Sequence, residues 1–367
     1  MGVSSITPAF PKISQELGIK PEQVAMLITF FTFPGVILTP ILGVLADRLG
    51  RKKILVPSLL LFSIAGTACF FIRNFHFLII MRFFQGMGAA ALGSLNITLI
   101  GDLYAGKQRN AAMGFNSSVL SIGTASFPLI GGTLATIAWY MPFILPVAAF
   151  PVGIGVLFFL KNPEPKNDQH LWDYLKEAWK NLKNVQIIGL FVFSALTFII
   201  LYGVFLTYFP FLLNHTFNAS PFIIGLILSS ASVSTALVSS QVGRLSHKYS
   251  EKTLMLFGVS LYILAIGSVP FMPTMWTLII PGLLFGAGNG VNFPSTQALM
   301  TSLAPMNQRA VILSLNGTVL RLGQTLGPLL MATVYALTCL DGVFYAGSIV
   351  AVLMMFLVVF TIKTNEG

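Results

Sequence analysis

The sequence predicts an all-α polytopic membrane protein built from two pseudo-symmetric six-helix bundles. Three observations predict this fold: a scarcity of charge, a series of long apolar runs, and an internal repeat. Hydrophobic residues make up 55% of the 367-residue chain and charged residues 9%, whereas soluble domains average about 25% charged residues. The charges are therefore too few to cover a water-facing surface of this size. The runs are continuously apolar rather than alternating, so a membrane-spanning β-barrel is not expected.

Eleven apolar runs are long enough to cross a bilayer, which needs about 20 residues. The 33 glycines and 20 prolines are typical of membrane helices that bend and approach one another closely. We expect the helices at residues 24–45, 54–72, 75–104, 110–138, 142–160, 185–213, 221–245, 253–271, 275–303, 310–337 and 342–362.

The character of the chain changes between residues 161 and 184, which hold nine charged residues. Trp172, Tyr174 and Trp179 recur there at roughly helical spacing, which predicts a short amphipathic helix at the membrane surface. We therefore interpret 161–184 as a cytoplasmic linker. It would separate an N-terminal bundle at 1–160 from a C-terminal bundle at 185–367.

The two bundles repeat, because adding 200 to a residue number aligns them without a gap over most of their length. Parallel repeats of six helices with a linker between them describe a known transporter architecture. The register holds at glycines and prolines, as in the pairs Gly43 and Gly243, Gly86 and Gly286, Gly88 and Gly288, and Pro128 and Pro328.

The first helix is incomplete under this alignment. Met1 corresponds to Leu201, whereas the matching run begins at residue 185, so 16 residues (201 − 185) have no counterpart. We expect residues 2–13 to be the outer end of the first helix and most of that helix to lie upstream.

The net charge of +10 does not indicate a nucleic-acid partner. Sixteen of the 21 lysines and arginines fall in segments that we place on the cytoplasmic side, which is the positive-inside pattern of a membrane protein. The loop at 43–53, with four basic residues among its five charges, is expected on that side. Cys69 and Cys339 have no cysteine or histidine at ligand spacing, so neither a disulfide nor a metal site is expected. No cleavable signal peptide is predicted.

The segment G-V-L-A-D-R-L-G-R-K-K at 43–53 resembles the loop signature between helices two and three of the major facilitator superfamily. Gly50 permits a turn with positive φ, and Asp47 suits the positive end of a helix. The resemblance implies that Asp47 faces the start of helix eleven, near Arg309, and that Arg51 pairs with an acid of helix four, for which Asp102 is well placed. These charges could instead serve topology alone. The expected cytoplasmic gate comprises Gly43, Asp47, Arg48, Gly50, Arg51 and Asp102.

A second segment, R-F-F-Q-G-M-G-A-A at 82–90, is similar to the helix-four signature of the same family. An arginine inside the bilayer costs at least ~2.5 kcal/mol, so Arg82 is expected to have a buried role. The resemblance implies a link to proton transfer, whereas a structural arginine would tie helix carbonyls together.

A third segment resembles the helix-five motif of drug and proton antiporters in this family, although Phe127 replaces the glycine before the proline. Proline removes a backbone hydrogen bond and glycines allow close packing. The residues expected to bend and pack helices are Gly123, Pro128, Gly131 and Gly132, with Gly327 and Pro328 in helix eleven.

A second intramembrane cation, Arg321, corresponds to Ser121 and is not explained by the repeat. It could bind an anionic or polar substrate or an acid of the missing segment, or it could be structural. None of the eleven acids is expected in mid-membrane, so a proton carrier would lie on the missing part of helix one, or coupling would differ or be absent. The residues expected at the coupling site or substrate cavity are Arg82, Gln85, Asn96, Asn116, Asn292, Asn316, Arg321 and Gln324.

The sequence thus favours a secondary active transporter, a monomer in the cell membrane that exports small amphiphilic molecules or drugs by alternating access. The energy source would be the proton gradient, with no cofactor or metal. The alternatives are facilitated or proton-coupled uptake of a metabolite and a truncated paralogue that does not transport. A membrane enzyme is least expected, because no catalytic cluster of side chains is evident.

Overall fold

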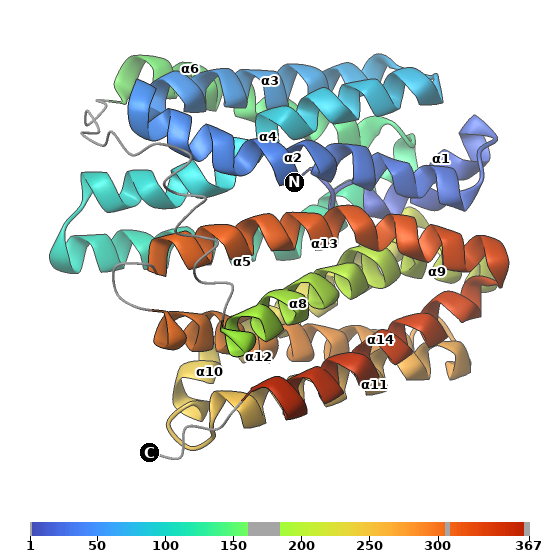
Figure 1. Ribbon diagram of the computed structural model, residues 1–367. Coiled ribbons are helices and arrows are strands. Elements are labelled where there is room, and N and C mark those ends of the chain that lie inside the picture. The colour runs from blue at the N-terminus through green and yellow to red at the C-terminus, as the bar shows by residue number, and fades with distance from the viewer. Residues whose placement is uncertain (1, 161–183, 305–308, 363–367) are drawn as a thin grey trace.

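The computed structural model describes residues 2–160, 184–304 and 309–362 and is helical throughout these ranges, without a strand (Figure 1). The expected membrane fold is confirmed. The first half contains two 3₁₀ segments and six α-helices. They are η1 (Thr7–Ala9), α1 (Phe10–Leu17), α2 (Pro21–Leu49), α3 (Arg51–Phe71), α4 (Phe75–Leu103), α5 (Gly106–Ile137), the 3₁₀ segment η2 (Met141–Ala148) and α6 (Ala149–Phe159).

The second half repeats this order after residue 184. Its first membrane crossing combines an α-helix, a π-helix and a second α-helix. The elements are α8 (Val185–Ile199), η3 (Ile200–Tyr208), α9 (Phe209–Phe217), α10 (Pro221–Leu245), α11 (Glu251–Ser268), η4 (Val269–Phe271), α12 (Ile279–Leu303), α13 (Arg309–Leu337) and α14 (Leu340–Thr361).

The helix bounds follow the predicted offset of 200 residues. Helices α2 and α10 begin at residues 21 and 221, α3 and α11 at 51 and 251, and α5 and α13 end at 137 and 337. A loop contact repeats too: the Lys52 ammonium donates to the Leu160 carbonyl at 3.1 Å, and the Lys252 ammonium donates to the Val359 carbonyl at 3.0 Å. The repeat therefore extends from the helices to the side chains that anchor their ends.

The two copies of the charged loop turn differently. Gly50 has a φ of +100°, in the positive region that glycine adopts at little cost. Ser250, its counterpart, has a φ of −65° and caps α11, because its hydroxyl accepts a hydrogen bond from the Thr253 amide. The serine therefore replaces the glycine turn with an ordinary helix start.

Several predicted bounds were wrong by a few residues, and three crossings are not single α-helices, one of them being the run expected at 253–271, which ends in the 3₁₀ segment η4. Residues 142–160 were expected to form one helix, but Pro142 and Pro146 lie in a 3₁₀ segment before α6. The run expected at 185–213 contains the π-helix η3 and continues to Phe217. Residues 2–13, expected as one helix end, form turns, η1 and the start of α1. The linker predicted at 161–184 lies outside the described residues except for Asn184, which caps α8.

Nine helical spans in the described ranges are long and apolar enough to cross a membrane, two fewer than the eleven expected. Helices α12 and α13 have the length, with 25 and 29 residues, but are not among the nine. Both contain amide side chains, and α13 also contains Arg321. These polar residues lower the mean hydropathy of the two helices.

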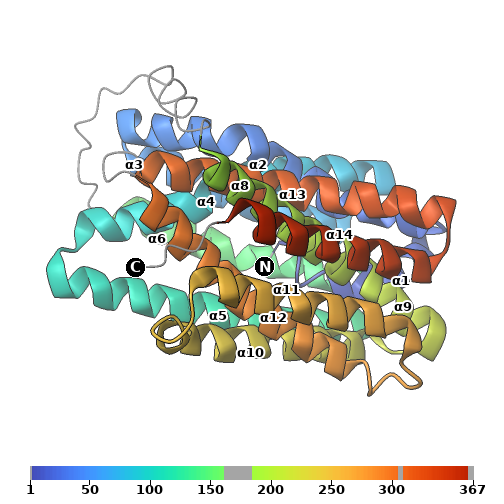
Figure 2. The ribbon, with the colours of Figure 1, turned by 60° about the horizontal axis from the view of Figure 1, so that its bottom comes forward.

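The two ends of the bundle pack differently. We call the end that holds the turn at Gly50 and the α4–α5 turn the loop end, and the opposite end, where α1 and α9 lie, the closed end (Figures 1 and 2). On α5, no described residue from 106 to 127 is buried, whereas Pro128, Gly131, Gly132 and Ala135 are. This buried stripe has helical spacing, so the described residues of α5 that are buried all lie near the closed end.

Candidate functional site

A cluster of charges lies at the loop end of the first half. The Arg51 guanidinium contacts the Asp102 carboxylate at 2.7 Å and the Asp47 carboxylate at 3.3 Å. These residues come from α3, α4 and α2, so Arg51 joins three consecutive helices. The Arg51 side chain is only 11% exposed, and low exposure strengthens an ion pair relative to a solvated one. The structure thus brings together three of the expected gate residues.

Of the other expected gate residues, Gly50 is buried at the turn, whereas Gly43 has open space beside it in this conformation. A Cβ atom built at Gly43 would meet no atom within 4 Å, and the same holds at Gly243. Arg48 is exposed. The described contacts of Asp47 stay within the first half, and residues 305–308, which precede α13, are outside the described ranges. A latch between the halves therefore stays a prediction that concerns another conformation.

Arg82 is buried in the interior of the first half with 1% of its surface exposed. Its Nε donates to the Leu27 carbonyl of α2 at 3.1 Å, and its Nη1 donates to Gln85 Oε1 at 2.6 Å. The guanidinium carbon lies 4.2 Å from the centre of the Phe31 ring, a cation–π contact. Arg82 thus ties α4 to α2 through a carbonyl, which fits the structural interpretation, although its Nη2 has no partner among the described residues.

Amide pairs join equivalent helices in the two halves. The Asn96 amide of α4 donates to Asn116 Oδ1 of α5 at 2.6 Å, and the Asn316 amide of α13 donates to Gln297 Oε1 of α12 at 3.2 Å. Asn116 and Asn316 are related by the 200-residue offset. Such bonds hold membrane helices together, and here they place an exposed amide, Asn96, between α4 and α5 and a buried amide, Asn316, between α12 and α13.

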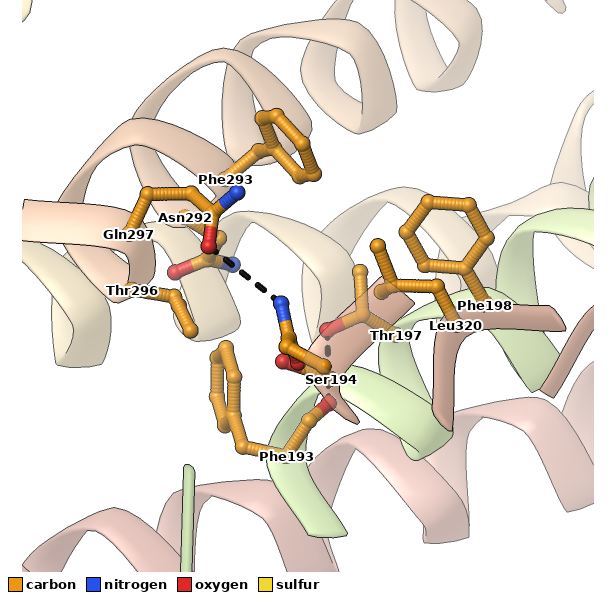
Figure 3. Close-up of a pocket in the computed structure, with 10 residues that line it drawn as sticks. Phe193, Ser194, Thr197, Phe198, Asn292, Phe293, Thr296, Gln297 and Leu320 are labelled. Atoms are coloured by element: carbon orange, nitrogen blue, oxygen red, sulfur yellow. Dashed lines mark hydrogen bonds between the residues drawn. The ribbon is translucent and has the colours of Figure 1, made fainter. Parts of the chain in front are cut away.

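A small pocket lies between α8, α12 and α13. Figure 3 shows Asn292 and Gln297 of α12 on one side and Ser194, Thr197 and Phe198 of α8 on the other. Asn292 is fully buried, yet neither its Oδ1 nor its Nδ2 has a partner in the described part of the chain. Because an unpaired buried amide costs about 1–3 kcal/mol, this residue suits a site that takes up water or a polar ligand.

Arg321 lies at the middle of α13 and packs against the middle of α2. A Cβ atom added at Gly35 would come within 3.2 Å of Arg321 Cδ. The Arg321 Nη1 donates to Gln324 Oε1 at 3.4 Å, a long bond. The side chain is partly exposed. Arg321 and Gln324, both expected at the cavity, are therefore neighbours at mid-membrane depth.

Threonine hydroxyls join the halves near the closed end, a feature that the sequence analysis missed. The Thr29 hydroxyl donates to the Thr325 carbonyl at 3.3 Å, and the Thr325 hydroxyl donates to Thr32 Oγ1 at 2.9 Å. All three side chains are buried: Thr29 is 6% exposed, Thr325 is 4% exposed and Thr32 is 1% exposed. Their sequence gives little signal, because most threonines in membrane helices bond only to their own helix.

The residues expected to bend and pack helices lie at close helix crossings, with one exception. Gly132 abuts the Pro221 carbonyl, and the Pro128 carbonyl abuts Gly225, so α5 crosses α10 there. Gly327 packs on Ile199, next to Pro328 in α13. Gly131 abuts the Ser5 carbonyl, whereas Gly123 has only its own helix neighbour Phe127 nearby.

Comparisons with known proteins agree with this architecture. The family model described as Major Facilitator Superfamily matches residues 1–216 and again 198–367. The chain is 26% identical to the bacillibactin exporter of Bacillus subtilis over all of this chain and 94% of that protein. It is 25% identical to multidrug resistance protein 2 of the same species, over all of this chain and 93% of that protein. The solved structure of the nucleoside transporter NupG superposes with a TM-score of 0.83 at 15% identity, over 98% of this chain and 96% of that one.

Proposed function

The chain belongs to the Major Facilitator Superfamily of small-molecule transporters, and from this membership and the geometry we propose that it exports small amphiphilic molecules in exchange for protons. The names of two similar proteins, an exporter and a multidrug resistance protein, support efflux as the direction. The structural similarity to NupG, at 15% sequence identity, supports the fold alone.

The observation that carries this proposal is the contrast between the two ends of the bundle. The halves contact each other through buried threonines near the closed end, while α5 is unburied over its loop-end portion. A bundle that is closed at one end and open at the other is one of the two states that alternating access requires. The amide pairs and Arg321 lie between these ends, where a substrate would be held.

The loop end faces the cytoplasm in this proposal, because most lysines and arginines gather there. The described conformation is then open toward the cytoplasm and ready to take up substrate from inside the cell. During the cycle the loop end closes, and Asp47 meets the positive start of α13. Arg51 and Asp102 position Asp47 for that contact.

The proposal is tested with purified protein in lipid vesicles loaded with an amphiphilic dye. An imposed proton gradient should accelerate movement of the dye against its own gradient, and collapse of the proton gradient should abolish that movement. Transport that is equal with and without the gradient would overturn proton coupling and favour facilitated transport.

The gate is tested with Asp47→Asn, which keeps the side-chain size and removes the charge. We expect a transport rate at least about tenfold lower, as for the loss of a charged contact of roughly 1.5 kcal/mol, with normal insertion. The matched control is Asp341→Asn in the first turn of α14 at the closed end, which should transport normally. Normal transport by Asp47→Asn would remove this residue from the gate.

A further inference from the structure

Arg321 differs from the other intramembrane arginine in how little of its hydrogen-bonding capacity is used. A guanidinium has five N–H donors, and the described part of the chain gives Arg321 one acceptor, Gln324 Oε1 at 3.4 Å. Arg82 instead has a 3.1 Å bond, a 2.6 Å bond and an aromatic ring against it. Arg321 is also partly exposed, whereas Arg82 is buried. The Arg321 guanidinium is therefore available to a ligand.

No carboxylate neutralises Arg321 within the described residues. The ion pairs found there join Arg51 to Asp47 and to Asp102 at the loop end. The remaining described acids stand at helix ends: Glu16 at the end of α1 and Glu22, Glu251 and Asp341 in first turns. The centre of the described bundle thus has a net positive charge. A charge in a low-dielectric site is stabilised by a counter-ion, so the centre favours an anion and disfavours a cation.

Aromatic rings lie beside this charge on α8, η3 and α12. The Phe198 ring stacks on the Tyr202 ring with centroids 5.8 Å apart and lies 6.5 Å from the Phe293 ring. Tyr202 is close enough to Arg321 to interact with it electrostatically. Phe198 and Phe293 also line the pocket described above, together with Leu320, the residue before Arg321. The charge and the rings therefore belong to one site.

The π-helix η3 carries Tyr202, one of the rings beside Arg321. Its wider turn is a rare form that is often found at functional sites. The Thr207 hydroxyl donates to the Tyr202 carbonyl at 2.6 Å, five residues earlier, and so satisfies a carbonyl within the π segment. On the other side of Arg321, the absent side chain at Gly35 leaves space for the stem of the arginine.

We infer that part of the substrate site selects aromatic anions, that is, planar rings that bear a carboxylate or a phenolate. This part consists of Arg321, Phe198, Tyr202 and Phe293. The guanidinium binds the acidic group, and the rings stack on the aromatic body. This inference rests on the proposed function and narrows its substrate class, since an exporter of amphiphiles in general would accept cations as readily.

The test compares two xanthene dyes of similar shape and opposite charge, fluorescein and tetramethylrhodamine methyl ester. Binding to the purified protein is measured by fluorescence anisotropy, and transport is measured in vesicles. Wild-type protein should bind fluorescein more tightly than the rhodamine ester. Arg321→Gln should weaken fluorescein binding on the order of 10- to 100-fold and leave rhodamine binding unchanged or improved, while Arg321→Lys should retain part of the preference for the anion.

The control is Arg244→Gln, an exposed arginine at the loop end of α10 that bonds to Gln241 and should leave both dyes unaffected. Equal or tighter binding of the rhodamine ester by wild-type protein, or no binding of fluorescein, would overturn the inference. An unchanged preference in a monodisperse Arg321→Gln protein would overturn it as well. Protein that binds fluorescein selectively but transports neither dye would contradict the proposed function and leave the anion site standing.

Discussion

Helix α2 packs in different ways against two of its neighbours, α4 in its own half and α13 in the other half. Toward α4, the Phe31 carbonyl lies so close to Gly86 that a side chain there would overlap it, and Arg82 donates to the Leu27 carbonyl. Toward α13, the contacts are threonine hydroxyls and the Gly35–Arg321 approach. The first interface is close backbone packing, and the second consists of small polar contacts.

On α2, the difference separates contacts within a half from contacts between the halves. Elsewhere the halves also meet through close backbone packing, where α5 crosses α10. Two of the three threonines at the second interface have an acceptor within their own helix. The Thr32 hydroxyl is 3.0 Å from the Ile28 carbonyl, and the Thr325 hydroxyl is 2.9 Å from the Arg321 carbonyl. When the halves part, these hydroxyls keep a partner, so separation leaves few unpaired groups. The α2–α4 interface has no such alternative, and opening it would expose close-packed backbone.

The largest effect is expected at the close-packed interface, for Gly86→Val. A Cβ at this position overlaps the Phe31 backbone, which cannot move without displacing α2. We expect no monodisperse protein after detergent extraction, as judged by size-exclusion chromatography. Gly286→Val should fail in the same way, because the Ala231 carbonyl occupies the equivalent place in the second half. Gly93→Val is the control on the same helix, where no atom lies within 4 Å; failure of this control would show that α4 tolerates no valine.

The next effect separates the two arginines by stability. Arg82→Ala removes a fully buried side chain and leaves Gln85 without its donor, so we expect a loss of about 3 kcal/mol. Arg321→Ala should cost less than about 1 kcal/mol, because the side chain is partly exposed and has one long bond. Thermal unfolding followed by a thiol-reactive dye measures both. Similar losses for the two variants would contradict the distinction between a structural and an available arginine.

The sequence predicted the features that depend on long periodic segments. Apolar length located the helices, and the 200-residue offset placed Pro128 and Pro328, and Asn116 and Asn316, at equivalent positions. The buried role of Arg82 followed from the cost of a charge in lipid. These predictions hold because each depends on local composition or on the repeat.

Other features depend on how distant helices pack and could not be predicted. The π-helix at Ile200–Tyr208 sits in a run whose composition fits an α-helix equally well. Thr29 and Thr325 lie 296 residues apart, and nothing local marks them as partners. Which end of the bundle is open is a property of one conformation, since the same sequence must also form the other.

A moderate effect is expected for Thr325→Val, which removes the hydroxyl shared by the two halves and preserves the shape. The loss of one buried hydrogen bond of about 1 kcal/mol should change the ratio of closed to open loop ends roughly fivefold, toward closure at the loop end. Spin labels at Leu49 and Arg244, one in each half, report this distance once the exposed Cys339 is replaced by serine. Thr333→Val is the control, because that hydroxyl bonds only to its own helix. An unchanged distance distribution in Thr325→Val would show that the threonines do not set the equilibrium.

The smallest effect is expected for Gln15→Leu, at another contact between the halves. The Gln15 amide of α1 donates to Asn214 Oδ1 of α9 at 3.3 Å, but Gln15 is exposed and Asn214 is partly exposed. Water competes for exposed amides, so this bond should be worth less than about 0.5 kcal/mol and its loss should change the open-to-closed ratio less than about twofold. The same pair of spin labels measures it. A shift as large as that of Thr325→Val would mean that position on the closed end, rather than burial of the hydroxyl, determines how firmly the halves are held.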